Sequence, residues 1–189
     1  MSNHVIRSKM YRIPASKVRQ SLTECFHSAL NFWQSGNYTA EKGGFHIAVG
    51  LWILGIEELG KYDLLEEALA GTGDQQGTIE IPVLIFKSHK VKLERGQARL
   101  KKWGVDLGQA GIPLTNDTRE SLWYVGWDEE DQEFKRDLSV LETGAFWKID
   151  SLRELVRLGL NKMQELQRAT VLESRSGETE STMLAAASM

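Results

Sequence analysis

Apolar residues recur along the chain with the spacing of helices. From about Pro14 to Gly36 they fall three and four residues apart, which predicts a first helix with one face in a core. The segment from about Tyr38 to Ala70 is apolar on nearly all sides in its first half, which predicts a second, buried helix. Further helices are expected from about Pro82 to Lys102 and from about Glu142 to Glu173. The pattern therefore predicts an all-α protein, an antiparallel bundle of four main helices.

The segments around these helices follow a different pattern. Residues 71–78 have the composition of a loop, and residues 104–118 are punctuated by glycine and proline and are expected to be irregular. Leu122 to Trp127 is aromatic and β-favouring, and the acidic run after it suits a turn. We therefore expect a small aromatic loop or hairpin before the last helix. Residues 173–189 read as a disordered tail, which leaves one domain over residues 1–172.

Composition narrows the class of protein. Hydrophobic residues make up 41% and charged residues 26%, which is typical of a soluble globular domain and excludes wholesale disorder. The one cysteine, Cys25, allows neither an intrachain disulfide nor a cysteine zinc cluster. The most apolar run, Phe45 to Ile56, is short of the roughly 20 residues that a membrane helix needs. The N-terminus lacks the apolar region of a signal peptide, so we expect a cytoplasmic protein with no membrane partner.

Charge is unevenly distributed. The net charge of −3 excludes a uniformly basic nucleic-acid binder. Residues 87–102, however, hold seven basic side chains against the single acid Glu94, and residues 128–133 are acidic. The basic segment could contact phosphate backbones, or it could be only a solvated helix face. The isolated histidines His4 and His27 lack the spacing of metal ligands, and we expect neither a metal nor another cofactor.

The candidate chemistry lies where polar residues follow the most buried run. Glu57, Glu58 and Lys61 are three or four residues apart at the end of that run. His89 and Lys92 share one face of the next predicted helix. If the two helices pack antiparallel, Lys61 lies level with residue 91 and Glu58 with residue 94. The sequence therefore predicts a cluster of carboxylates, ammoniums and an imidazole at this seam.

Two interpretations of the cluster stay open. In the functional one, His89 is a general acid or base tuned by Glu58, and Lys61 and Lys92 stabilise a phosphodiester. In the structural one, the same residues form an ion-pair network that fixes helix register. The aromatic side chains of Trp123, Tyr124 and Trp127 could likewise stack on bases or close one end of the bundle.

Three motifs occur in the order found in one known family. AEKGGFHIAVGLWILGIEELGKYDLL carries Glu57, Glu58 and Lys61, FKSHKVKL carries His89 and Lys92, and TRESLWYVGWD follows with its basic residue and aromatic-Tyr-Val stretch. Together they resemble the AbiV family of bacterial abortive-infection proteins over roughly residues 15–170. The resemblance implies an all-α fold of the HEPN type, a homodimer, and a role in defence against phage in which an infected cell arrests its growth or translation.

HEPN proteins are often metal-independent ribonucleases whose catalytic motif is an Arg and a His separated by four to six residues. No Arg precedes His89 at that spacing, and Arg19 and His27 are seven intervening residues apart. Our expectation is a metal-independent endoribonuclease with the catalytic set Glu58, Lys61, His89 and Lys92. The residues expected to bind RNA or a partner are Glu57, Lys87, Lys90, Arg95, Arg119, Tyr124 and Trp127. The alternative is a non-catalytic module that binds RNA, a ribosome or a phage-encoded trigger protein and blocks translation.

Overall fold

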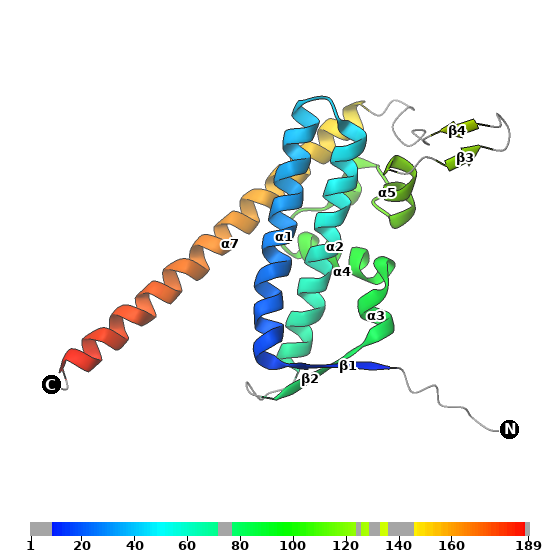
Figure 1. Ribbon diagram of the computed structural model, residues 1–189. Coiled ribbons are helices and arrows are strands. Elements are labelled where there is room, and N and C mark those ends of the chain that lie inside the picture. The colour runs from blue at the N-terminus through cyan, green and yellow to red at the C-terminus, as the bar shows by residue number, and fades with distance from the viewer. Residues whose placement is uncertain (1–8, 72–76, 124–125, 129–132, 136–145, 188–189) are drawn as a thin grey trace, which may run out of the picture.

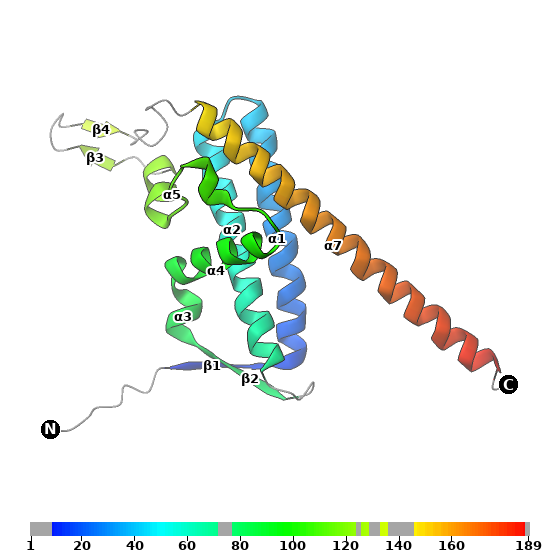
Figure 2. The same cartoon turned by 180° about the vertical axis from the view of Figure 1, so that it is seen from behind.

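Two long helices, α1 (Ala15–Glu41) and α2 (Phe45–Ala70), lie side by side and antiparallel in the computed structural model (Figures 1 and 2). The structure describes residues 9–71, 77–123, 126–128, 133–135 and 146–187. The helical bundle expected from the sequence is confirmed. Within the described part of the chain, no helix is both long enough and apolar enough to span a membrane.

The turn between α1 and α2 lies later than predicted. We expected α1 to end at Gly36, but it continues to Glu41, and the chain turns at Gly43, whose φ is +82°. Gly36 lies inside α1, and the ring of Trp52 packs against it. A Cβ at this position would lie only 2.5 Å from that ring. The glycine therefore permits a close helix contact and does not end the helix.

The third predicted helix is interrupted. It forms α3 (Val83–Lys87) and α4 (His89–Lys102), which are separated by Ser88 in an extended conformation. The Ser88 hydroxyl accepts a hydrogen bond from the backbone N–H of Val91 at 3.3 Å and so caps α4. His89 consequently occupies the first position of α4.

A short ribbon joins segments that are distant in the sequence. Strand β1 (Met10–Pro14) pairs antiparallel with β2 (Thr78–Pro82), with Ile13 opposite Ile79. The ribbon crosses one end of the α1–α2 pair (Figure 1) and contributes to a small second core. The sequence analysis predicted neither strand, because each is only five residues long and its partner lies on the far side of two helices.

The remaining elements are η1 (Leu107–Ala110), α5 (Asn116–Trp123), β3 (Gly126–Asp128), β4 (Glu133–Lys135) and α7 (Phe146–Ala187). Leu122, which we expected to begin a strand, is instead buried in helix α5. Strands β3 and β4 pair antiparallel, but the side chain of Trp127 and all of Tyr124 lie outside the described residues. Helix α7 continues to Ala187, through the segment expected to be a disordered tail.

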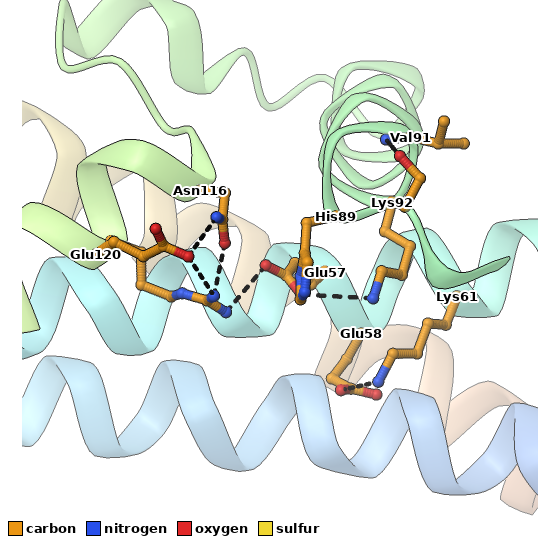
Figure 3. A network of polar contacts seen from close by, with 10 residues as sticks. Glu57, Glu58, Lys61, His89, Val91, Lys92, Asn116 and Glu120 are labelled. Atoms are coloured by element: carbon orange, nitrogen blue, oxygen red, sulfur yellow. Dashed lines mark hydrogen bonds and ion pairs between the residues drawn. The ribbon is translucent and has the colours of Figure 1, made fainter. Parts of the chain in front are cut away.

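Helices α2 and α4 touch through their backbones. A Cβ on Gly60 would overlap the carbonyl oxygen of Lys92, and a Cβ on Gly96 would overlap that of Ile56. These pairs agree with the predicted register, but α4 crosses α2 steeply and does not run antiparallel to it (Figure 3). The crossing places the polar residues of α4 directly over the middle of α2.

Candidate functional site

A buried carboxylate, that of Glu57, gathers basic groups from two other helices. Its Oε2 accepts a hydrogen bond from His89 Nδ1 at 2.8 Å, and Lys92 Nζ lies 3.7 Å from the same oxygen. Its Oε1 accepts a hydrogen bond from Arg119 Nη1 at 3.2 Å (Figure 3). We call Glu57, His89, Lys92 and Arg119 the Glu57 cluster.

Local structure brings each member to this point. Glu57 lies between Ile56 and Leu59 of the buried run on α2, so its side chain leaves the helix next to the core. His89 and Lys92 are three residues apart on α4 and therefore share a face. Arg119 is oriented within α5, where its Nη2 donates to Asn116 Oδ1 at 2.5 Å. Helices α2, α4 and α5 thus each contribute to one site.

Exposure differs sharply within the cluster. The side chains of Glu57 and Lys92 are 5% and 8% exposed, whereas that of His89 is 49% exposed. A carboxylate can only accept, so Nδ1 of a neutral His89 must carry the proton and Nε2 the lone pair. Among the described residues, no partner is found for Nε2. The His89 imidazole is therefore hydrogen-bonded to a buried carboxylate while half of its side chain is exposed to solvent.

Charged groups of both signs meet at the Glu57 cluster. Burial lowers the pKa of Lys92, the Glu57 carboxylate opposes this effect, and the Lys61 and Arg119 charges add to it. Glu57 contacts the Lys92 ammonium, the Arg119 guanidinium and the His89 imidazole, and Arg119 Nη2 also lies 3.9 Å from the exposed Glu120 carboxylate. With His89 neutral, two cations therefore face two carboxylates. Among the described residues, no group of His, Cys, Asp and Glu side chains is arranged to hold a metal ion.

Two members of the predicted catalytic set lie elsewhere. Glu58 and Lys61 point away from α4 and toward α1, where Lys61 Nζ donates to Glu58 Oε1 at 2.5 Å (Figure 3). Burial, followed by the charge of Glu58, raises the pKa of the Cys25 thiol on α1 to about 12. His89 is thus hydrogen-bonded to Glu57 and not to Glu58, because successive helix residues point about 100° apart.

The predicted binding residues are divided between several places. Arg119 belongs to the Glu57 cluster, although its position 62 residues after Glu57 gave no sign of this contact. Lys87 and Lys90 are exposed on either side of His89, and Lys90 Nζ lies 4.0 Å from Glu94. Arg95 joins a different group of charges. Tyr124 and the side chain of Trp127 lie outside the described residues.

This second group was missed by the sequence analysis. Asp63, which is buried, accepts from Arg99 Nε at 3.0 Å and lies 3.3 Å from Arg95 Nη1. Glu66 pairs with Arg99, and Glu67 lies 2.5 Å from Arg95. Burial alone would lower the pKa of Arg99, but the Glu66 and Asp63 carboxylates raise it. We call these five residues the Asp63 cluster. Acids spaced three and four apart on α2, facing arginines four apart on α4, are the signal that could have identified it.

The site lies within a region that resembles known proteins. A family model described as AbiV, of the HEPN type, matches residues 17–144. The matched region contains α1 from residue 17 onward, helices α2 to α5 and every residue of the Glu57 cluster. No curated protein and no solved structure matches the chain.

Proposed function

Because the chain belongs to the AbiV family of HEPN-type proteins, we propose that it is an abortive-infection effector that cleaves RNA without a metal ion. The family indicates a defence function of this kind, and the helical fold fits it. The cleavage step rests on one observation: the His89 imidazole is hydrogen-bonded to a buried carboxylate and remains half exposed. The homodimer expected from the resemblance stays a prediction.

The geometry supports general base catalysis by His89. Its Nε2 would take the proton of a ribose 2′-hydroxyl, and the 2′ oxygen would attack the adjacent phosphorus. The Glu57 carboxylate would stabilise the imidazolium formed in this step, as buried carboxylates do for catalytic histidines. The P–O5′ bond then breaks, and the imidazolium returns its proton to the leaving 5′ oxygen. The products are a 2′,3′-cyclic phosphate and a 5′-hydroxyl.

The surrounding cations would bind the RNA backbone. Arg119 lies on the same carboxylate as His89 and can stabilise charge on the phosphate oxygens. Lys87 and Lys90, which are exposed beside His89, would hold neighbouring phosphates. The arginine that is missing upstream of His89 in the sequence is thus supplied from α5. This arrangement supports nuclease chemistry in a chain that lacks the short Arg-to-His motif.

The direct test is RNA integrity in cells that express the chain. We expect defined fragments with 2′,3′-cyclic phosphate ends in the wild type. His89→Ala should reduce cleavage by about 10²–10⁴-fold, which is the usual contribution of a general base. Glu57→Gln should also reduce it, because a neutral amide stabilises the imidazolium less. Growth arrest with intact RNA would contradict the nuclease proposal.

One observation favours the alternative, a binding module that blocks translation. Leu84 is 71% exposed on α3, and Ile85 beside it is also exposed, next to the basic residues around His89. Exposed apolar side chains of this kind are typical of protein contacts. In this case Leu84→Ser should abolish capture of ribosomes or of a phage protein and relieve growth arrest. His89→Ala would then keep the arrest, which separates the two functions.

A further inference from the structure

Two polar residues on α5 extend the Glu57 cluster and take no part in the proposed cleavage step. Asn116 Oδ1 accepts a hydrogen bond from Arg119 Nη2 at 2.5 Å, and Asn116 Nδ2 donates to Glu120 Oε1 at 2.6 Å. Figure 3 shows Asn116 and Glu120 next to each other beside the cluster. The chain of hydrogen bonds that begins at His89 therefore continues through Arg119 as far as Glu120.

The orientation of the Asn116 amide follows from its two neighbours. Its carbonyl oxygen faces the Arg119 guanidinium, which can only donate, and its NH2 group faces the Glu120 carboxylate, which can only accept. The reversed amide would place donor against donor and acceptor against acceptor, so the neighbours exclude it. The NH2 group carries two hydrogens, and within the described part of the chain Glu120 is the one partner found for them. An amide N–H and a carboxylate thus stand side by side on α5.

The Glu120 carboxylate lies where a negative charge opposes the RNA backbone. Its side chain is 53% exposed, and its Oε1 is 3.9 Å from Nη2 of Arg119, the residue proposed to contact phosphate. A carboxylate repels phosphate but accepts hydrogen bonds from N–H donors. In single-stranded RNA the N–H donors lie on the edges of the bases, where proteins read the sequence. A carboxylate at this point therefore suits a base and not a phosphate.

The order of donors and acceptors identifies the base. The two oxygens of Glu120 accept and the adjacent N–H of Asn116 donates, so the complement is two neighbouring donors followed by an acceptor. Guanine presents this order on its Watson–Crick edge, as N2–H, N1–H and O6. Adenine, cytosine and uracil each present a single donor group there, with an acceptor next to it. Among the four RNA bases, guanine alone can give two neighbouring donors to one carboxylate.

We propose that Asn116 and Glu120 recognise a guanine next to the phosphate at which His89 acts. This inference rests on the proposed ribonuclease function and adds a base preference to it. The guanine N1–H and N2–H would donate to Glu120, and O6 would accept from Asn116. Because Glu120 is charged, its hydrogen bonds to the base are roughly twice as strong as neutral ones. The two residues determine specificity and move no proton.

The test is single-turnover cleavage of end-labelled oligouridylates that carry one purine, by the purified full chain. The uridine steps of the same molecule give the reference rate. With guanosine, cleavage next to the purine should be at least about tenfold faster than at the uridine steps, which is a usual discrimination for a two-bond contact to a base. Inosine lacks the N2 donor and should fall between guanosine and adenosine. 7-Deazaguanosine should match guanosine, because N7 takes no part.

Glu120→Gln is the decisive variant, because the exposed side chain can be changed without disturbing the fold. The ratio of cleavage at guanosine to cleavage at uridine should fall to within about threefold of unity, while cleavage at the uridine steps is kept or rises. Glu94→Gln is the matched control: it removes an exposed carboxylate from α4, outside the Asn116–Glu120 pair, and should keep the ratio. A merely structural role of Glu120 would change the rates at all steps together and leave their ratio unchanged.

The outcomes separate this inference from the proposed function. Equal cleavage at all steps, or a guanosine preference that persists in Glu120→Gln, would overturn guanine recognition and leave the ribonuclease function in place. A wild-type chain that cleaves none of these RNAs would overturn both.

Discussion

Two charged clusters flank the same helix crossing and differ in how their charges are balanced. On α2, Glu57 precedes Gly60 and Asp63 follows it. The Glu57 cluster has an imidazole, an ammonium and a guanidinium around Glu57, and its guanidinium also lies 3.9 Å from Glu120. The Asp63 cluster has three carboxylates for two guanidiniums. The first is therefore balanced when the imidazole is neutral and positive when it is protonated, whereas the second has an excess of negative charge.

The difference shows what each cluster can do. Guanidiniums and carboxylates keep their charges near neutral pH, so the Asp63 cluster can fix helix positions but cannot move a proton. The Glu57 cluster contains an imidazole, a group that can accept and donate a proton, and the ammonium and guanidinium beside it can bind an anion. We infer that the Asp63 cluster is structural and that the Glu57 cluster carries the chemistry.

The largest effect is expected at the crossing that separates the clusters. Gly60→Ala would place a methyl group against the Lys92 carbonyl oxygen and force α2 and α4 apart. We expect a loss of unfolding free energy at or above the upper end of the about 1–3 kcal/mol that is usual for overpacking, measured by urea unfolding. Gly71→Ala is the matched control, because its Cβ would meet only the carbonyl oxygens of Glu67 and Ala68, at the ordinary contact distances of 3.5 and 3.8 Å. Equal stability of the two variants would show that the backbones are not in contact.

Breaking the Asp63 cluster should come next. Asp63→Ala leaves Arg95 and Arg99 without their shared buried carboxylate, which should cost about 3 kcal/mol of unfolding free energy. Glu67→Ala, on the exposed side of the same cluster, should change stability by about 0.5 kcal/mol or less. RNA cleavage per folded molecule should stay at the wild-type level in both. A selective loss of cleavage in Asp63→Ala would contradict a purely structural role.

Alkaline pH should distinguish the cations of the two clusters. Burial lowers the pKa of folded Lys92 below its ordinary value of 10.5, so the folded chain binds fewer protons than the unfolded chain between these two pKa values. The Lys92 contribution to stability therefore rises with pH through this window. Lys92→Met should lack this rise in unfolding free energy with pH. Arg99→Met should keep the rise, because it retains Lys92 and because a guanidinium does not titrate in this pH window.

The measurement is unfolding free energy against pH for these two variants and the wild type. Tyr62 and Cys25 have raised pKa values and reduce stability in alkali, but all three proteins share them. The difference between Lys92→Met and the wild type therefore isolates the ammonium, whereas Arg99→Met also removes the charge that lowers the Tyr62 pKa. Parallel curves for Lys92→Met and the wild type would contradict the desolvation of Lys92.

Only a small change in stability is expected for the residue with the largest proposed role. His89 is half exposed, so His89→Ala should lower the unfolding free energy by about 1 kcal/mol or less. Differential scanning calorimetry beside an activity assay separates folding from function. A loss of several kcal/mol would indicate that the imidazole mainly supports the fold.

The long helices could be predicted from the sequence, but their ends and partners could not. Periodic spacing of apolar residues located α1 and α7, because burial of one face imposes that period, and a run that is apolar on nearly all sides located α2. Gly36 was misread as a helix end, since the sequence does not show that Trp52 packs against it. The β1–β2 ribbon was missed because its strands are short and are separated in the sequence by α1 and α2.

The candidate site was located only in outline. His89 and Lys92 were placed near the carboxylates of α2, because an antiparallel register puts Lys61 level with residue 91 and Glu58 with residue 94. Whether His89 and Lys92 contact Glu57 or Glu58 depends on the steep crossing of α4 over α2. The spacing of apolar residues in the sequence does not reveal that angle. Arg119 was singled out by its motif, but its contact with Glu57 depends on the fold. The pocket lined by Tyr62, Trp103 and Gln167 was not predicted, because side chains from α1, α2, α7 and the end of α4 contribute to it.

The central claim is that catalysis depends on the Glu57 cluster and not on the Asp63 cluster. The most direct measurement is single-turnover cleavage of a labelled RNA by the purified chain, with His89→Ala compared with Arg95→Ala. Both variants remove a partly exposed basic group from α4, one from each cluster. We predict a loss of about 10²–10⁴-fold for His89→Ala and a change within about threefold for Arg95→Ala. Equal losses, or cleavage by His89→Ala at the wild-type rate, would contradict the claim.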